Sequence, residues 1–180
     1  RTRFSIAHEL AHYFLEHHRA HYLRGGRPQP SRSEFFTPVI MEREADAFAS
    51  GVLLPSHLLR PFVNECELST ERIDEIATEF RTSRVSTAIS AVRLSDFPCA
   101  LVGVREGRVA WSFRSDCMIE AGLYPPVRDA SLSKDASQRW DAFVNGGDIP
   151  VSGGAFAKEW FRTYEKDHLD ALPVTEYYLP

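Results

Sequence analysis

The chain has 180 residues, of which 43% are hydrophobic and 26% are charged, and its formal net charge is -4. This composition is ordinary for a globular protein, and the length supports one sizeable domain or two small ones. The net negative charge gives the chain no overall attraction for nucleic acid or for anionic membranes. No apolar run approaches the roughly 20 residues that span a bilayer, and no signal-peptide pattern opens the sequence.

The three cysteines, Cys66, Cys99 and Cys117, are widely spaced and include no CxxC pair. They indicate reduced thiols rather than a disulfide framework, so we expect a cytoplasmic protein. The chain begins at Arg1, without Met, inside a patterned segment. We therefore expect it to be a fragment of a longer polypeptide whose preceding segment is missing.

The first sixty or so residues have helical patterns. Residues 4–23 predict an amphipathic helix, whose apolar side chains are Ile6, Leu10, Tyr13 and Phe14. Residues 24–33 are rich in Gly, Pro and Ser and predict a mobile loop. A second helix is predicted over residues 41–54, ended by Pro55, and a shorter one over residues 56–65. The apolar stripe expected on the second helix consists of Ala45, Phe48, Ala49, Val52 and Leu53.

Two more short helices, joined by a tight turn, are predicted over residues 69–94. Ser69 or Thr70 is the expected N-cap of the first helix, and residues 81–83 are the expected turn. The side chains expected to face inward are Ile73, Ile76, Ala77, Phe80, Val85, Ala88, Ile89 and Val92. This arrangement resembles a helix-turn-helix, and we assign residues 61–97 to it.

The pattern becomes β-rich after Pro98. Residues 99–113 contain two β-rich runs around Glu106 and Gly107, which is typical of a hairpin. Short helices or loops are then expected over 115–124 and 133–147, and further strands over 154–161 and 174–180. The predicted fold class is therefore α+β, with a helical part and a small mixed α/β part that meet near residue 97.

The segment at residues 4–23 contains five of the seven histidines. His8 and His12 are four residues apart, so on a helix they lie one turn apart on the same side. Two such imidazoles suit zinc, which prefers a tetrahedral shell with nitrogens at roughly 2.0–2.1 Å. Glu9 cannot be a third ligand on that face, but it can accept a proton from metal-activated water and pass it to the leaving amine. The HExxH spacing predicts a metalloprotease site with Glu9 as its general base.

A third metal ligand is expected from the second predicted helix. Glu42 and Asp46 are four residues apart there, so they share a face. Glu42 would complete a His-His-Glu shell with one position left for water, and Asp46 would hydrogen-bond a ligating histidine and hold its tautomer. Glu44 points roughly 200° away from Glu42 around the helix and is the weaker candidate.

The other histidines of the first segment have no such partner in the sequence pattern. We interpret His17, His18 and His21 as surface residues that are favourable beside the negative pole of a helix. One of them, or Tyr22, is a candidate to stabilise the oxyanion of a tetrahedral intermediate. The sequence does not choose among these four.

Two blocks of the sequence resemble one known family. "RFSIAHELAH" at residues 3–12 and "EREADAFASGVLLP" at residues 42–55 are similar to the paired motifs of the ImmA/IrrE metallo-endopeptidases. The resemblance implies a metal site of the His-His-Glu (gluzincin) type, with His8, His12 and Glu42 as ligands and Glu9 as general base. It also implies a partner, because family members cleave a helix-turn-helix repressor at one site and derepress its genes, in some members during a stress response.

The resemblance also gives expectations for the domains. Residues 1–60 would be a zincin-like metallopeptidase core without its N-terminal part, and residues 61–97 the helix-turn-helix-like region. Residues 98–180 would be a β-rich α/β domain, compatible with the GAF-like sensor domain of the radiation-response members. The strand that aligns substrate in zincin folds should precede Arg1, so this chain does not support edge-strand substrate binding.

Two alternatives keep the fold but change the function. The chain would be a DNA-binding regulator or a toxin-like protein paired with a repressor, and its metal site would be structural or vestigial. Direct DNA binding is disfavoured, because the second helix of the pair offers only Arg84 and Arg93 as outward basic residues and the first helix is acidic. The expected cofactor is Zn²⁺, although two imidazoles and a carboxylate also accept Mn²⁺ or Fe²⁺.

Overall fold

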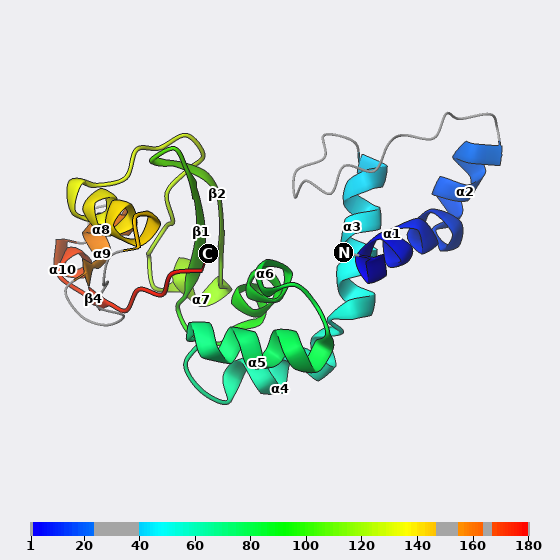
Figure 1. Ribbon diagram of the computed structural model, residues 1–180, viewed down its shortest axis with the longest axis horizontal. Helices are drawn as coiled ribbons and strands as arrows, with labels where there is room; N and C mark the ends of the chain where they lie inside the picture. The colour runs from blue at the N-terminus through cyan, green and yellow to red at the C-terminus, as the bar shows by residue number, and fades with distance from the viewer. Residues whose placement is uncertain (1, 24–39, 147–154, 164–166, 180) are drawn as a thin grey trace.

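The computed structural model describes residues 2–23, 40–146, 155–163 and 167–179. Within these ranges the chain is rich in helix and has two small antiparallel sheets, so the predicted α+β class is confirmed (Figure 1). In chain order the elements are α1 (Thr2–Phe14), α2 (Glu16–Leu23), α3 (Ile40–Leu53), α4 (Ser56–Asn64), α5 (Thr70–Phe80), α6 (Arg84–Leu94), β1 (Ala100–Arg105), β2 (Arg108–Arg114), α7 (Asp116–Glu120), α8 (Lys134–Val144), β3 (Ala155–Phe156), α9 (Ala157–Trp160), α10 (Asp167–Asp170) and β4 (Pro173–Val174).

Helices α1 and α3 pack directly against each other. The fully buried apolar side chains between them are small: Ala7 and Ala11 from α1, and Ala45 and Ala49 from α3, each at most 3% exposed. Alanine adds little bulk between two helices, so their axes can approach closely. This close approach brings the polar residues on the same faces of α1 and α3 within contact distance.

The prediction of one amphipathic helix over residues 4–23 is wrong in two respects. The helix is interrupted at Leu15, which separates α1 from α2. The predicted apolar stripe also lies on the outside, with Ile6 56% exposed and Phe14 63% exposed. The physical reason is that α1 buries its alanine face, together with His8, against α3, and the larger apolar side chains lie on the remaining surface.

Helices α5 and α6 and the turn between them lie where the sequence predicts a pair of short helices, and α4 packs against α6. Ser69 is the N-cap of α5, because its hydroxyl accepts a hydrogen bond from the Arg72 amide. Arg81 then takes a left-handed conformation with φ 53° and ends the helix. The core of this region is apolar and consists of Leu54, Leu59, Val63, Ile73, Ile76, Ala88 and Ala91.

The predicted hairpin is also confirmed. Strands β1 and β2 pair antiparallel, and the connecting Glu106 and Gly107 have φ angles of 52° and 70°. Positive φ at both positions is the pattern of a type I′ turn, whose twist matches that of the strands. Gly103 in β1 lies under the indole of Trp111, where an added Cβ would be only 2.3 Å from a ring carbon. The hairpin packs against α6, so it continues the structure directly from the helical region.

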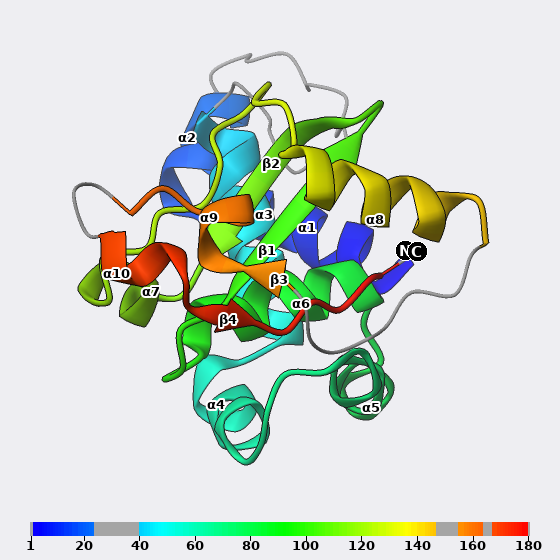
Figure 2. The same ribbon diagram turned by 90° about the vertical axis from the view of Figure 1, so that its left-hand side faces the viewer.

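The last part of the chain is less regular than predicted. The expected strand at residues 154–161 is a two-residue strand, β3, followed by the short helix α9, and the expected strand at 174–180 is reduced to the end of β4. In this part of the chain the partly buried Arg139 forms ion pairs with both Glu159 and Glu176. Beyond β4 the chain returns toward α6, and Leu179 packs on the core of α4–α6 (Figure 2).

The two parts on either side of residue 97 are thus in contact through α6, the hairpin and the C-terminal segment. Their division into separate domains and the GAF-like character of residues 98–180 stay predictions. The loop predicted at residues 24–33 lies outside the described residues. No helix in the described part of the chain is long and apolar enough to cross a lipid bilayer.

Candidate metal centre

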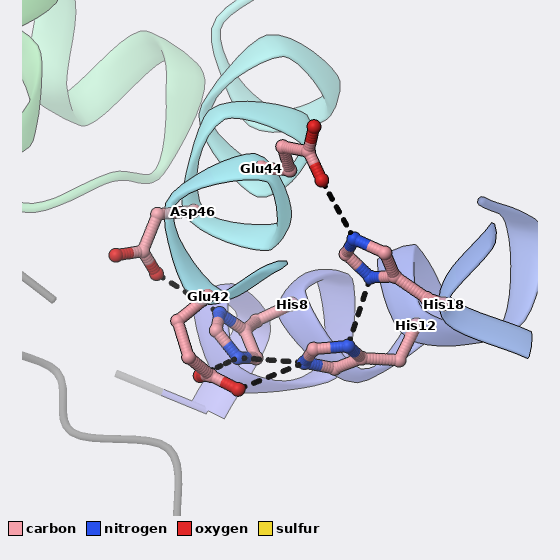
Figure 3. Close-up of polar contacts among 6 residues, drawn as sticks. All are labelled: His8, His12, His18, Glu42, Glu44 and Asp46. Carbon is pink, nitrogen blue, oxygen red and sulfur yellow. Dashed lines mark hydrogen bonds and ion pairs between the residues drawn. The ribbon is translucent and has the colours of Figure 1, made fainter. Parts of the chain in front are cut away.

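Three side chains meet at the interface of α1 and α3 (Figure 3). The Nε2 atom of His8 lies 3.2 Å from Nε2 of His12 and 3.2 Å from Oε2 of Glu42. The other carboxylate oxygen of Glu42 lies 3.6 Å from Nε2 of His12. His8 and Glu42 are each only 3% exposed. The structure therefore brings together the three residues that the sequence predicts as ligands, His8 and His12 from one helix and Glu42 from another.

The spacing of the two ring nitrogens and the two carboxylate oxygens of Glu42 fits a small divalent cation. Around a tetrahedral zinc ion with nitrogen ligands at roughly 2.0–2.1 Å, two ligand atoms are about 3.4 Å apart. The three separations in the structure are 3.2, 3.2 and 3.6 Å. Two imidazole nitrogens and a carboxylate oxygen are also a donor set that zinc uses in catalytic sites. The residues present thus fit the metal that the sequence predicts.

Asp46 contacts the first histidine of the motif from the side away from Glu42 (Figure 3). Its Oδ1 atom lies 2.9 Å from Nδ1 of His8. Burial raises the pKa of the Asp46 carboxyl, and the hydrogen bond from His8 acts in the opposite direction, toward the ionised form. Both ring nitrogens of His8 face a carboxyl group, Asp46 at Nδ1 and Glu42 at Nε2. With a metal ion on Nε2, the ring proton would lie on Nδ1 and be donated to Asp46. This is the contact expected for Asp46 from the sequence.

Glu9 and Tyr22 border the same site. Glu9 is exposed on α1, and the Tyr22 ring meets the His12 ring edge-on with centroids 5.6 Å apart. Burial raises the pKa of Tyr22, and the charges of Glu42 and Glu9 raise it further. Burial also lowers the pKa of His12 and so favours its neutral form, which is the form that binds a metal. Tyr22, a candidate for oxyanion stabilisation, thus lies beside one of the candidate ligands.

The interpretation of His18 as a surface residue is wrong. Its side chain is fully buried, with Nδ1 lying 3.0 Å from Nδ1 of His12 and Nε2 lying 2.9 Å from Oε2 of Glu44. His17 also contacts Glu44, at 2.7 Å, but its side chain is 60% exposed, and His21 is exposed as expected.

Sequence reasoning missed His18 because six residues separate it from His12. On an unbroken helix this spacing places two side chains about 240° apart, but the interruption at Leu15 turns His18 back toward His12. The carboxylate Glu44, the weaker third-ligand candidate, lies with His17 and His18 and not with His8 and His12. The only signal in the sequence is the pair of adjacent histidines just after the motif.

Two histidines and a buried carboxylate that converge from two packed helices define a candidate centre of the metallopeptidase class. Residues 1–94 of the chain match the family model of the IrrE N-terminal-like domain. The match covers more than half of the chain, which therefore belongs to the ImmA/IrrE family of metallopeptidases, as its two sequence blocks predict. A comparison with curated proteins finds no match to this chain.

Proposed function

We propose that this protein is a zinc-dependent endopeptidase that cleaves a helix-turn-helix transcriptional repressor at one site. The observation that carries the proposal is the convergence of His8, His12 and Glu42, whose ligand atoms lie 3.2–3.6 Å apart at the interface of α1 and α3. Atoms of this kind are held at these distances by a proton or a cation between them, and one divalent cation would satisfy both ring nitrogens and the carboxylate at once. Membership of a metallopeptidase family supports the same reading.

The residues of the site would have different roles in the reaction. His8, His12 and Glu42 would hold the ion, which when bound supplies Lewis-acid chemistry and lowers the pKa of water. Glu9 accepts the proton of the attacking water and passes it to the leaving amine. Tyr22 keeps its hydroxyl proton, because its pKa is raised, and can donate a hydrogen bond to the oxygen of the scissile carbonyl as charge develops there.

The zincin-like core and the repressor substrate rest on the family resemblance. The helix-turn-helix-like region supports a docking or scaffold role more than DNA binding. The two basic residues of α6 are already engaged: Arg84 makes a bidentate contact with Asp74 at 2.5 and 2.7 Å, and the Arg93 guanidinium lies over the Phe113 ring at 4.6 Å. Phosphate contacts need basic groups that are free to reach the nucleic acid backbone.

The proposal is tested by incubating the protein with repressors encoded near its own gene, with and without added Zn²⁺. We expect one repressor to yield a single pair of fragments, whose junction is read by mass spectrometry. The Glu9→Gln variant and a sample treated with chelator serve as controls and should leave the repressor intact. Cleavage that persists in both controls would contradict the proposed chemistry.

A further inference from the structure

The candidate metal centre continues into a second group of polar residues behind His12 (Figure 3). Nδ1 of His12 lies 3.0 Å from Nδ1 of His18, and Nε2 of His18 lies 2.9 Å from Oε2 of Glu44. The same oxygen of Glu44 contacts Nε2 of His17 at 2.7 Å. A continuous series of contacts therefore runs from the ligand His12 in α1, through His18 in α2, to Glu44 in α3.

The protons along this series have one consistent arrangement when the imidazoles of His12 and His18 are neutral. A carboxylate oxygen only accepts hydrogen bonds, so the Nε2 atom of His18, 2.9 Å from Oε2 of Glu44, donates. A neutral imidazole carries a single N–H, so Nδ1 of His18 is an acceptor. Nδ1 of His12 must then donate to it, which leaves the Nε2 lone pair of His12 facing His8 and Glu42.

We propose that His18, itself oriented by Glu44, is a positioning residue that fixes the tautomer and ring orientation of the metal ligand His12. This inference rests on the proposed function. Each ligating histidine then has its own partner, since Asp46 contacts Nδ1 of His8 and His18 contacts Nδ1 of His12. Partners of this kind raise the basicity of the ligand and hold its ring in the binding orientation. The fully buried side chain of His18 suits that task, because burial restricts its own rotation.

A second metal ion at His17, His18 and Glu44 is the competing interpretation, since their ligand atoms lie within 4.8 Å of one another. An ion on Nε2 of His18 would move the ring proton to Nδ1, where it would face the Nδ1 proton of His12. Two N–H groups that face each other with nitrogens 3.0 Å apart repel. With neutral imidazoles, the two sites therefore cannot bind ions at the same time in this arrangement. The hydrogen bonds from His12 to His18 and from His18 to Glu44 leave Nε2 of His12 free to bind the ion of the first site.

The test measures Zn²⁺ affinity of the 180-residue chain by competition with a chromophoric chelator. His18→Phe keeps a ring of similar size but loses the acceptor, and we expect about 10–100-fold weaker binding. His18→Asn places an amide oxygen near the position of Nδ1, so we expect it to recover most of the affinity. The matched control is His21→Phe, the same substitution at an exposed position of α2, which should bind as the unmodified chain does.

A spectroscopic measurement distinguishes a role of His18 in orienting His12 from a role in packing alone. The visible absorption of bound Co²⁺ should change in His18→Phe and return toward its original form in His18→Asn, while circular dichroism shows unchanged helix content in both. Wild-type affinity in His18→Phe would overturn the inference. So would equal losses in the Phe and Asn variants, or two bound ions per unmodified chain.

These outcomes are distinct from a failure of the proposed function. If the unmodified chain binds no metal, or if His12→Ala binds it equally well, the metallopeptidase proposal itself fails and His18 has no ligand to position. If the unmodified chain binds one ion through His12 and the His18 variants do too, only the role of His18 is refuted.

Discussion

Glu9 lies between the two histidines in the sequence but is exposed beside them in the structure, so its substitution separates chemistry from metal binding. For Glu9→Gln we expect at least about a 10²-fold loss of repressor cleavage, because the amide cannot take a proton from water. Metal content, measured by atomic absorption, should stay unchanged. His12→Ala should instead lose both metal and cleavage, since it removes a ligand. Normal cleavage by Glu9→Gln would show that another group is the base.

The two glutamates of α3 provide a sharper comparison, because they are two positions apart and contact different histidines. Glu42 lies with His8 and His12, whereas Glu44 lies with His17 and His18. We expect Glu42→Ala to weaken Zn²⁺ binding more than Glu44→Ala does, because the first removes a ligand and the second only a group that orients His18. Chelator competition measures both. An equal loss of Zn²⁺ affinity in the two variants, or a larger loss in Glu44→Ala, would contradict the assignment of Glu42 as the third ligand.

Among the secondary-structure elements, the β1–β2 hairpin depends on one small residue. A methyl group at Gly103 would overlap the Trp111 indole, at 2.3 Å from its nearest carbon. We expect Gly103→Ala to destabilise the fold by about 1–3 kcal/mol, as overpacking does. Gly51→Ala in α3 is the matched control, because nothing lies within 4 Å of its added Cβ.

The control substitution at Gly51 should change stability in the opposite direction. Alanine in a helix interior is more favourable than glycine by about 0.5–1 kcal/mol, so Gly51→Ala should stabilise the protein slightly. Urea unfolding followed by circular dichroism measures both variants. If Gly103→Ala is as stable as the unmodified chain, the Trp111 indole moves freely and the hairpin does not require glycine there.

For the molecule as a whole, a bound ion would link α1 to α3 and so stabilise the folded state. At a free Zn²⁺ concentration about 100 times the dissociation constant, linkage gives about 2.7 kcal/mol. For a chain of this size that corresponds to a rise in Tm of roughly 5–10 °C. We expect this rise in differential scanning fluorimetry, its reversal by chelator, and its absence in His12→Ala. An equal rise in His12→Ala would place the stabilising ion elsewhere.

Local features were predictable from the sequence because they depend on residues close together in the chain. The approach of His8 and His12 follows from the four-residue spacing on any helix, and the Ser69 cap and the turn at Glu106 and Gly107 follow from local backbone chemistry. The motif, and with it the family, is readable for the same reason.

Only the tertiary structure determines which residues from distant segments contact these local features. The alanine faces of α1 and α3 set the rotation of one helix against the other, which brings Glu42 rather than Glu44 to His8 and His12. The interruption at Leu15 brings His18, a histidine predicted to be exposed, into a buried contact with His12. The periodicity of the sequence predicts neither of these contacts, because they depend on how two distant segments pack and on where a helix is interrupted.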